Sequence, residues 1–172
     1  GEDSQRQAGI PEGKIEQHTF TNSKVFPDAK RHPPIYAPAQ YDGSKPACLM
    51  VFQDGHANEA VDGKFRVPIV FDNLIHKKEM PITIAVFIDP GHKKPKLPPQ
   101  RGWRPKPENR SFEYDALSDA YSRLLMEELL PEVEKNTKSA KTQLAEPSVE
   151  SAPVVYVRLR WPGSDRTRLA RS

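Results

Sequence analysis

The chain has 172 residues, enough for one domain, and combines 18 prolines with a hydrophobic content of only 36%. No stretch approaches the roughly 20 apolar residues of a transmembrane helix, so we expect no membrane span. Cys48 is the only cysteine, which excludes a disulfide within the chain. The sequence starts at Gly1 rather than Met and continues with polar residues, which slightly favours an exported, processed protein. It contains no signal-peptide pattern, so any signal peptide has been removed or never existed.

The net charge of +3 is unevenly distributed along the chain. Residues 137–172 hold seven Lys or Arg and three Asp or Glu, a local charge of +4. Residues 1–136 hold 19 Lys or Arg and 20 Asp or Glu, a local charge of −1. A nucleic-acid site would have to lie in the basic tail alone, and we expect no nucleic-acid partner.

The first quarter of the chain contains weak strand patterns. Residues 1–13 are polar and predict a loose leader. Alternation over 14–23 is typical of an exposed strand, and two prolines within 32–37 indicate a poor edge strand or a loop. The continuous apolar run at 48–53 then predicts a strand buried on both faces.

The next part of the chain alternates helix and strand. Residues 67–78 have apolar residues at helical spacing, and 82–88 is a second buried strand. A long loop rich in Pro and Lys covers 89–110, and 116–133 predicts an amphipathic helix. The apolar face of that helix comprises Leu117, Tyr121, Leu124, Leu125 and Leu129. This order predicts an α/β fold with a mostly parallel sheet, which two buried strands leave incomplete.

Three stretches carry a family resemblance: PAQYDGSKPACLMVFQDGH, FDNLIHKKEMPITIAVFIDPG and RSFEYDALSDAYSRLLMEELLPEVEKN. Over residues 14–136 the chain resembles the Putative esterase family of α/β-hydrolases, especially members similar to enterochelin esterase and feruloyl esterase. The resemblance implies the N-terminal part of an α/β-hydrolase fold with a mixed, mostly parallel sheet. It also implies a serine carboxylic-ester hydrolase that acts on a small-molecule ester through an acyl-serine intermediate, without a cofactor.

The same resemblance implies a nucleophile that this sequence lacks. The family's serine lies in a G-x-S-x-G elbow after the next strand, with an acid and a histidine further along. The elbow is expected soon after residue 136, yet no G-x-S-x-G occurs in the chain and no histidine follows His92. The chain as written is therefore expected to be inactive as an esterase.

A lost base near Asn136–Thr137 would explain both the missing elbow and the basic tail. Residues 145–155, AEPSVESAPVV, have codons that read GAICGVSSGG when regrouped by one base, and this contains the elbow G-V-S-S-G. The restored nucleophile codon begins at Ser151. Only the first base of each restored codon is free, and regrouping 155–171 continues as ICAFTVAWERPDAF, like the helix after the family's elbow. Residues 137–172 are thus interpreted as an out-of-frame tail on a truncated, poorly soluble esterase fragment.

Three other interpretations stay open. Residues 154–161, VVYVRLRW, alternate like a genuine C-terminal strand. The arginines of the tail could instead form a surface for anionic ligands, which would make the chain a non-catalytic binding module. They are Arg158, Arg160, Arg166, Arg168 and Arg171. The third interpretation requires the restored frame: the protein would transfer the acyl group to an alcohol, as in mycolyltransferase-like relatives.

Ester hydrolysis also needs donors for the oxyanion of the tetrahedral intermediate. By resemblance, the loop after the strand at 48–53 supplies one of them, so the backbone N–H groups of Asp54, Gly55 and His56 are the candidates. An ordinary strand-to-loop turn is the alternative. The His56 side chain lies in the wrong place for the family's catalytic histidine and is interpreted as a loop histidine.

Arg110, Glu113 and Tyr114, in the stretch RSFEY, match a recurring motif of the family. We expect an Arg110–Glu113 ion pair to brace the long loop beneath the substrate site, in preference to touching substrate. His92 is interpreted as a solvent-facing loop residue. The stretch HANEAVDG has no metal-ligand spacing, so no metal is expected.

Overall fold

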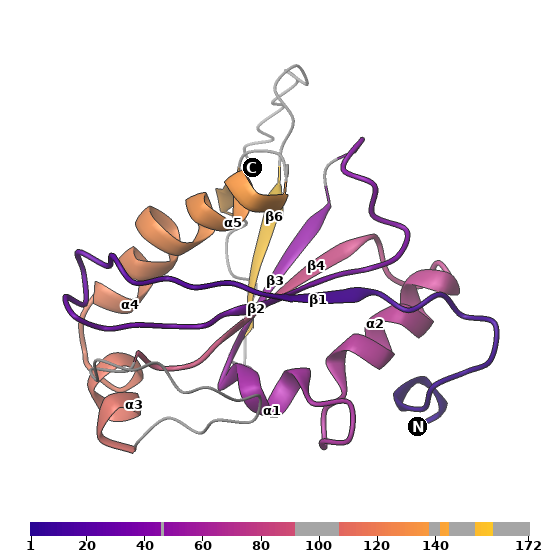
Figure 1. Ribbon diagram of the computed structural model, residues 1–172, viewed down its shortest axis with the longest axis horizontal. Helices are drawn as coiled ribbons and strands as arrows, with labels where there is room; N and C mark the ends of the chain where they lie inside the picture. Colours follow the sequence, from indigo (N-terminus) through magenta and orange to yellow (C-terminus); the bar gives the residue numbers. More distant parts are fainter. Residues whose placement is uncertain (46, 92–106, 138–141, 145–153, 160–172) are drawn as a thin grey trace, which may run out of the picture.

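A mixed sheet organises the fold, with strands in the order β1-β2-β4-β3-β6-β5 (Figure 1). The computed structural model describes residues 1–45, 47–91, 107–137, 142–144 and 154–159. At the centre, β3 (Cys48–Gln53) and β4 (Thr83–Ile88) pair in parallel. The chain crosses between them through α1 (Gly55–Glu59) and α2 (Val67–His76). The two buried strands and the helix between them are as predicted.

The other strands run antiparallel to their neighbours. On one side, β2 (Pro34–Ala37) pairs with β4, and β1 (Lys14–Gln17) pairs with β2. The expectation of a loop or edge strand at 32–37 is wrong, because β2 lies between two strands and is largely buried. The two prolines are tolerated because Pro33 precedes the strand and Pro34 is its first residue, where a missing N–H matters least.

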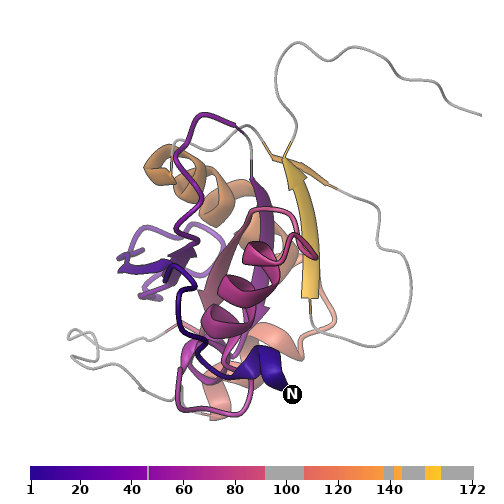
Figure 2. The same cartoon turned by 90° about the vertical axis from the view of Figure 1, so that its right-hand side faces the viewer.

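The other edge of β3 is paired as well. The backbone of β6 (Val154–Leu159) runs antiparallel along β3, and β5 (Thr142–Leu144) pairs with β6 (Figure 2). Both edges of β3 are therefore paired. A strand forms within 154–161, as the alternative interpretation of the tail required. The antiparallel direction of β6 differs from that of a strand that follows a right-handed crossover, because such a strand would lie parallel to β3.

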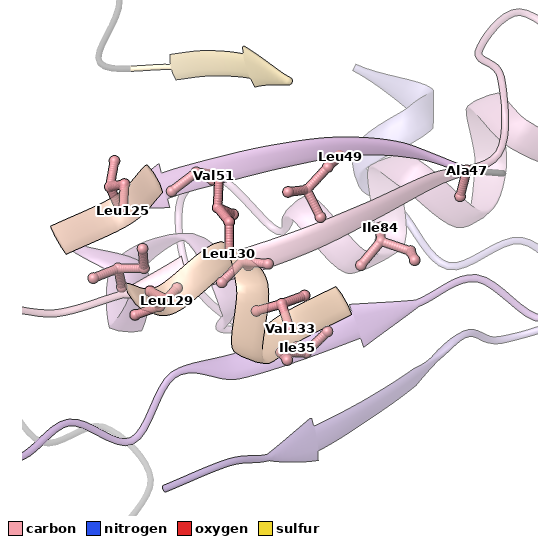
Figure 3. Close-up of a cluster of buried hydrophobic side chains, with 11 residues drawn as sticks. Ile35, Ala47, Leu49, Val51, Ile84, Leu125, Leu129, Leu130 and Val133 are labelled. Carbon is pink, nitrogen blue, oxygen red and sulfur yellow. The ribbon is translucent and has the colours of Figure 1, made fainter. Parts of the chain in front are cut away.

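Each face of the sheet has its own apolar cluster. On β4, Ile84, Val86 and Ile88 face one cluster, while Ala85 and Phe87 face the other. The first cluster packs against the helices after residue 120, and its labelled members lie between helix and sheet in Figure 3. The second packs against α2 through side chains that include Phe71. Because β4 contacts both clusters, every residue of β4 after Thr83 is apolar, as expected for a strand covered on both faces.

Three consecutive helical segments cover the first face. They are α4 (Ala120–Arg123), a π-helical stretch η2 (Leu124–Leu129) and α5 (Leu130–Thr137). Pro131 has no N–H to bond to the preceding turn, which accounts for the widened turn just before it. The predicted helix start at 116 is wrong, and Leu117, assigned to the apolar face, is fully exposed. Leu124, Leu125 and Leu129 are buried as predicted.

The polar leader packs against α2 rather than hanging loose. Its 3-10 turn η1 (Glu2–Ser4) lies beside α2, where the Asn73 side chain donates hydrogen bonds to the carbonyls of Asp3 and Gln5. The buried carboxylate of Asp72 accepts one hydrogen bond from Arg6 at 2.6 Å and one from the Gly13 N–H at 2.8 Å. Sequence polarity alone could not reveal these partners.

Candidate functional site

The strongest candidate site is the turn where β3 passes into α1, at the carboxyl end of the parallel strand pair. Asp54 precedes α1 in the left-handed backbone region, with φ 51° and ψ 48°. Asp and Asn tolerate this conformation better than other residues with side chains. Such strained residues persist only where their surroundings hold them and are concentrated at functional sites. Asp28, Arg66 and Lys78 also have positive φ, so the turn is distinguished by its position at the carboxyl ends of β3 and β4 rather than by this conformation alone.

Gly55 follows Asp54 and lies directly against β4. A Cβ added at this position would lie 2.5 Å from the carbonyl carbon of Phe87 and 2.6 Å from the nitrogen of Ile88. Both are backbone atoms, so neither can move aside cheaply. The residue after β3 must therefore be glycine for α1 to approach β4 this closely. This constraint comes from packing within the protein.

His56 joins the turn to the end of β4. Its Nδ1 lies 2.7 Å from Oδ1 of Asp89, and its backbone N–H donates to the same oxygen at 3.4 Å. Both side chains are about four-fifths buried. His56 lies in α1, so the interpretation as a loop residue is wrong in that respect. The His56 N–H is engaged by Asp89, and the Asp54 N–H by the Tyr114 hydroxyl. Gly55 is therefore the strongest of the three candidates for an oxyanion donor, and that role stays a prediction.

Arg110 holds the Asp54 carboxylate from the neighbouring helix α3 (Pro107–Tyr114). Its Nε lies 3.0 Å from Oδ1 of Asp54, and its Nη2 lies 2.8 Å from Oδ2. These two donors make a bidentate pair, the geometry that best matches a guanidinium to a carboxylate. The hydrogen bond and the charge of Asp54 raise the pKa of Arg110.

Glu113 binds a different arginine from the one expected. Its Oε1 lies 2.7 Å from Nη2 of Arg31 and accepts the Gly91 N–H at 2.8 Å. Both charged side chains are more than 95% buried. The expected Arg110–Glu113 pair is therefore wrong, because Arg110 pairs with Asp54.

Tyr114 completes the attachment of α3 to the strand ends. Its hydroxyl donates to the carbonyl of Ile88 at 3.0 Å, and its ring contacts that of Tyr121 edge to face at 4.9 Å. Arg110 lies over the Tyr114 ring at 5.5 Å. Burial raises the pKa of Tyr114 above its ordinary range and that of Tyr121 to about 12, so both hydroxyls stay neutral near pH 7.

The three motif residues thus all attach α3 to neighbouring segments, although through different partners from those predicted. Arg110, Glu113 and Tyr114 share one face of α3 because they are three and four residues apart. Asp89 was missed, but it had a signal, because it directly follows the apolar run of β4 as Asp54 follows that of β3. Arg31 gave no such signal. His92 and residues 92–106 of the long loop lie outside the described residues.

Two negative observations apply to the part of the chain that the structure describes. No helix there is both long enough and apolar enough to cross a membrane. No group of three or more His, Cys, Asp or Glu side chains there could hold a metal ion.

Comparison with known proteins now identifies the class. The family described as Putative esterase matches residues 24–149, well over half of the chain, so the chain belongs to this family. The match includes residues 137–149, beyond the position at which the sequence indicated a change of frame. No curated protein is significantly similar to the chain.

Solved structures similar to the chain include feruloyl esterases. A ferulic acid esterase from the anaerobic fungus Anaeromyces mucronatus is 17% identical, with a TM-score of 0.57, over 82% of this chain and 50% of its own. The same enzyme in complex with ferulic acid is 18% identical, with a TM-score of 0.57, over 82% and 49%. A mutant feruloyl esterase module from Clostridium thermocellum complexed with sinapinate is 13% identical, with a TM-score of 0.51, over 80% and 40%.

These likenesses establish the α/β-hydrolase fold, and the chain spans about half the length of the first two of these structures. The expected α/β-hydrolase fold class is confirmed. The expectation of a mostly parallel sheet is wrong for the described strands, because among them only β3 and β4 pair in parallel.

Proposed function

We propose that this chain is the N-terminal half of a serine carboxylic-ester hydrolase and supplies the oxyanion side of its active site. The observation that carries the proposal is the left-handed turn at Asp54–Gly55, held at the carboxyl end of β3 in a chain of the esterase family. Ligand sites of open α/β sheets lie at this edge. In α/β-hydrolases a loop N–H in this region and the N–H after the nucleophile together bind the oxyanion.

The proposed reaction is acyl transfer through serine. The serine hydroxyl would attack the ester carbonyl, and a histidine would accept its proton and later return it to the leaving alcohol. Water would then release the acid from the acyl-serine. Neither the elbow serine nor a histidine beyond His92 is encoded in this chain. We therefore propose that the chain as written does not hydrolyse esters.

We further propose that the missing half is encoded out of frame after Asn136. The restored elbow G-V-S-S-G and the helix that follows it support this proposal. So does the antiparallel direction of β6, since a strand leading to the elbow is expected to run parallel to β3. An exposed strand edge is a template for any segment able to pair with it, which accounts for the pairing of an out-of-frame segment with β3.

The substrate would be a small-molecule ester with a sugar, phenolic or siderophore component. The neighbour solved with ferulic acid supports a phenolic acid as the first acyl group to test. Transfer to an alcohol instead of water uses the same acyl-serine, and product analysis with added alcohols separates the two reactions.

The test compares two proteins made from the source gene. One is the 172-residue chain, and the other carries one inserted base after the Asn136 codon and continues to the next stop codon. With a short-chain nitrophenyl ester and methyl ferulate, we expect a rate only from the second protein. Replacing the serine of its restored elbow with alanine should abolish that rate. A clear rate from the 172-residue chain, or none from the restored protein, would contradict the proposal.

A second candidate is a non-catalytic binding module, favoured by the formation of β6 within the basic tail. In that case the 172-residue chain should bind an anionic polymer such as heparin, and binding should weaken steeply with salt. Deleting residues 137–172 should abolish it. If the chain and the deletion variant bind equally weakly, this candidate is excluded.

A further inference from the structure

Arg110 contacts the side chain of Asp54, not the backbone of the candidate oxyanion turn. It comes from α3, 56 residues further along the chain than Asp54, and its three hydrogen bonds to the Asp54 carboxylate measure 2.8 to 3.1 Å. The Asp54 side chain is one-third exposed and that of Arg110 nearly half exposed. Solvent therefore screens the pair, and its contribution to overall stability is small.

The effect of the pair on the backbone is more specific. Asp54 has a left-handed conformation, and the next residue, Gly55, lies against the backbone of β4. On the other side of the turn, His56 is held by Asp89. The turn is therefore fixed at both ends, by Arg110 before Gly55 and by Asp89 after it. Arg110 contacts the side chain of the left-handed residue, Asp54, while the Asp54 carbonyl accepts hydrogen bonds from the Ala57 N–H and the Asn58 side chain.

Arg110 is itself held in place from its own helix. Tyr114, one turn later on α3, donates to the carbonyl of Ile88, and Glu113 pairs with the buried Arg31. The guanidinium also lies over the Tyr114 ring. With its helix anchored at these two points, Arg110 presents its donors in a fixed direction, which is the requirement for a residue that orients another.

We propose that Arg110 is a positioning residue for the oxyanion turn, acting through the Asp54 carboxylate on the backbone at Asp54 and Gly55. This inference rests on the proposed function for the purpose of the turn, but not for the effect of Arg110 on it. Arg110 would touch no substrate. Lysine, a point charge without the planar fork of donors, could replace it only in part.

Hydrogen-exchange mass spectrometry on the full 172-residue chain tests this without any catalytic readout. The reporters are the amides at the start of α1, where the Ala57 N–H donates to the Asp54 carbonyl. In Arg110→Gln we expect exchange there to rise about fivefold, the effect of losing a well-formed exposed ion pair. Exchange in α2 should not change, and Arg110→Lys should fall between the two.

Two further variants exclude a general loss of structure. Arg123→Gln breaks an exposed Arg–Glu pair of similar exposure within the helices after 120 and should leave α1 unchanged. In an Asp54→Asn background, which tolerates the left-handed turn but lacks the carboxylate, Arg110→Gln should have no added effect. If Arg110→Gln changes α1 no more than Arg123→Gln does, or acts fully in the Asn background, the proposal is wrong.

The same result separates this inference from the proposed function. Increased exchange at α1 supports the positioning role even if the restored-frame protein hydrolyses nothing. Unchanged exchange overturns it even if that protein is an active esterase.

Discussion

The hydroxyl of Tyr36 in β2 donates a 2.6 Å hydrogen bond to the carboxylate of Asp72 in α2, linking the sheet to the helix that covers it. Both residues are almost completely buried. The same carboxylate holds Gly13 and Arg6 of the leader. One buried acid thus joins three parts of the chain.

Replacing this acid should destabilise the fold. Asp72→Ala leaves the Tyr36 hydroxyl buried without its acceptor, which we expect to cost about 2–3 kcal/mol in the free energy of unfolding. Urea unfolding measures it. Lys77→Ala, which removes the exposed ion pair between Asp3 and Lys77, the residue that follows α2, is the control and should leave the midpoint unchanged. Equal midpoints for the two variants would contradict the assigned role of Asp72.

Gly55 should not tolerate a side chain. The methyl group of Gly55→Ala would meet the β4 backbone at 2.5 Å, so helix and strand must separate. Overpacking of this kind costs about 1–3 kcal/mol. Gly63→Ala, where the nearest atom lies 3.0 Å away in a turn, is the matched comparison and should cost less. A thermal melt in which both variants behave alike would show that the close approach of α1 to β4 is not required.

Glu128 should make stability depend on pH. Burial acts to raise its pKa, but hydrogen bonds from the Ser23 hydroxyl and the Lys24 and Val25 N–H groups outweigh burial and lower the pKa below the ordinary 4.5. The folded state then favours the charged form. Its contribution is complete above the unfolded pKa and is lost as pH falls through the lower folded value.

Urea midpoints measured from pH 7 down to pH 3 test this. Glu128→Gln should be less stable than the parent at pH 7, and the difference should shrink towards pH 3. Glu127→Gln, on the exposed side of the same helical turn, should follow the parent's pH profile. A difference that stays constant with pH would contradict the assigned charge of Glu128.

The two leucines that the sequence assigned to one helix face should behave very differently. Leu129 is 1% exposed within the cluster of Figure 3, so Leu129→Ala should cost about 2–5 kcal/mol. Leu117 precedes the helix and is fully exposed, so Leu117→Ala should change stability by less than about 0.5 kcal/mol. Chemical denaturation distinguishes these outcomes, and a large loss at Leu117 would contradict the helix start at Ala120.

Elements whose residue pattern reflects their burial were predictable. All residues of β3 and β4 except Gln53 and Thr83 are apolar because both faces of the strands are covered, and α2 has one apolar face. The two prolines within 32–37 concealed β2, a strand that is paired on both edges. The sequence pattern does not show which backbone hydrogen bonds of a strand need the N–H that proline lacks. The helix start failed because Leu117 fits the helical period by chance.

The candidate site was predictable only in part. The position of the turn at Asp54–His56 followed from the end of β3 and the family resemblance. Its partners did not, because ion pairs between distant segments leave no periodic signal. Arg110 and Glu113 are three residues apart on a helix, which made them appear to be partners. The fold directs them instead to Asp54 and Arg31.

The most direct test of the central claim is to resequence the source DNA from codon 130 to beyond codon 172. We predict one additional base after the Asn136 codon, or an unchanged sequence in which the other frame still encodes an esterase past codon 172. Either result would mean that an esterase reading frame continues beyond this half. An unchanged sequence with no esterase coding in any frame would contradict the account, and the basic tail would then belong to the protein itself.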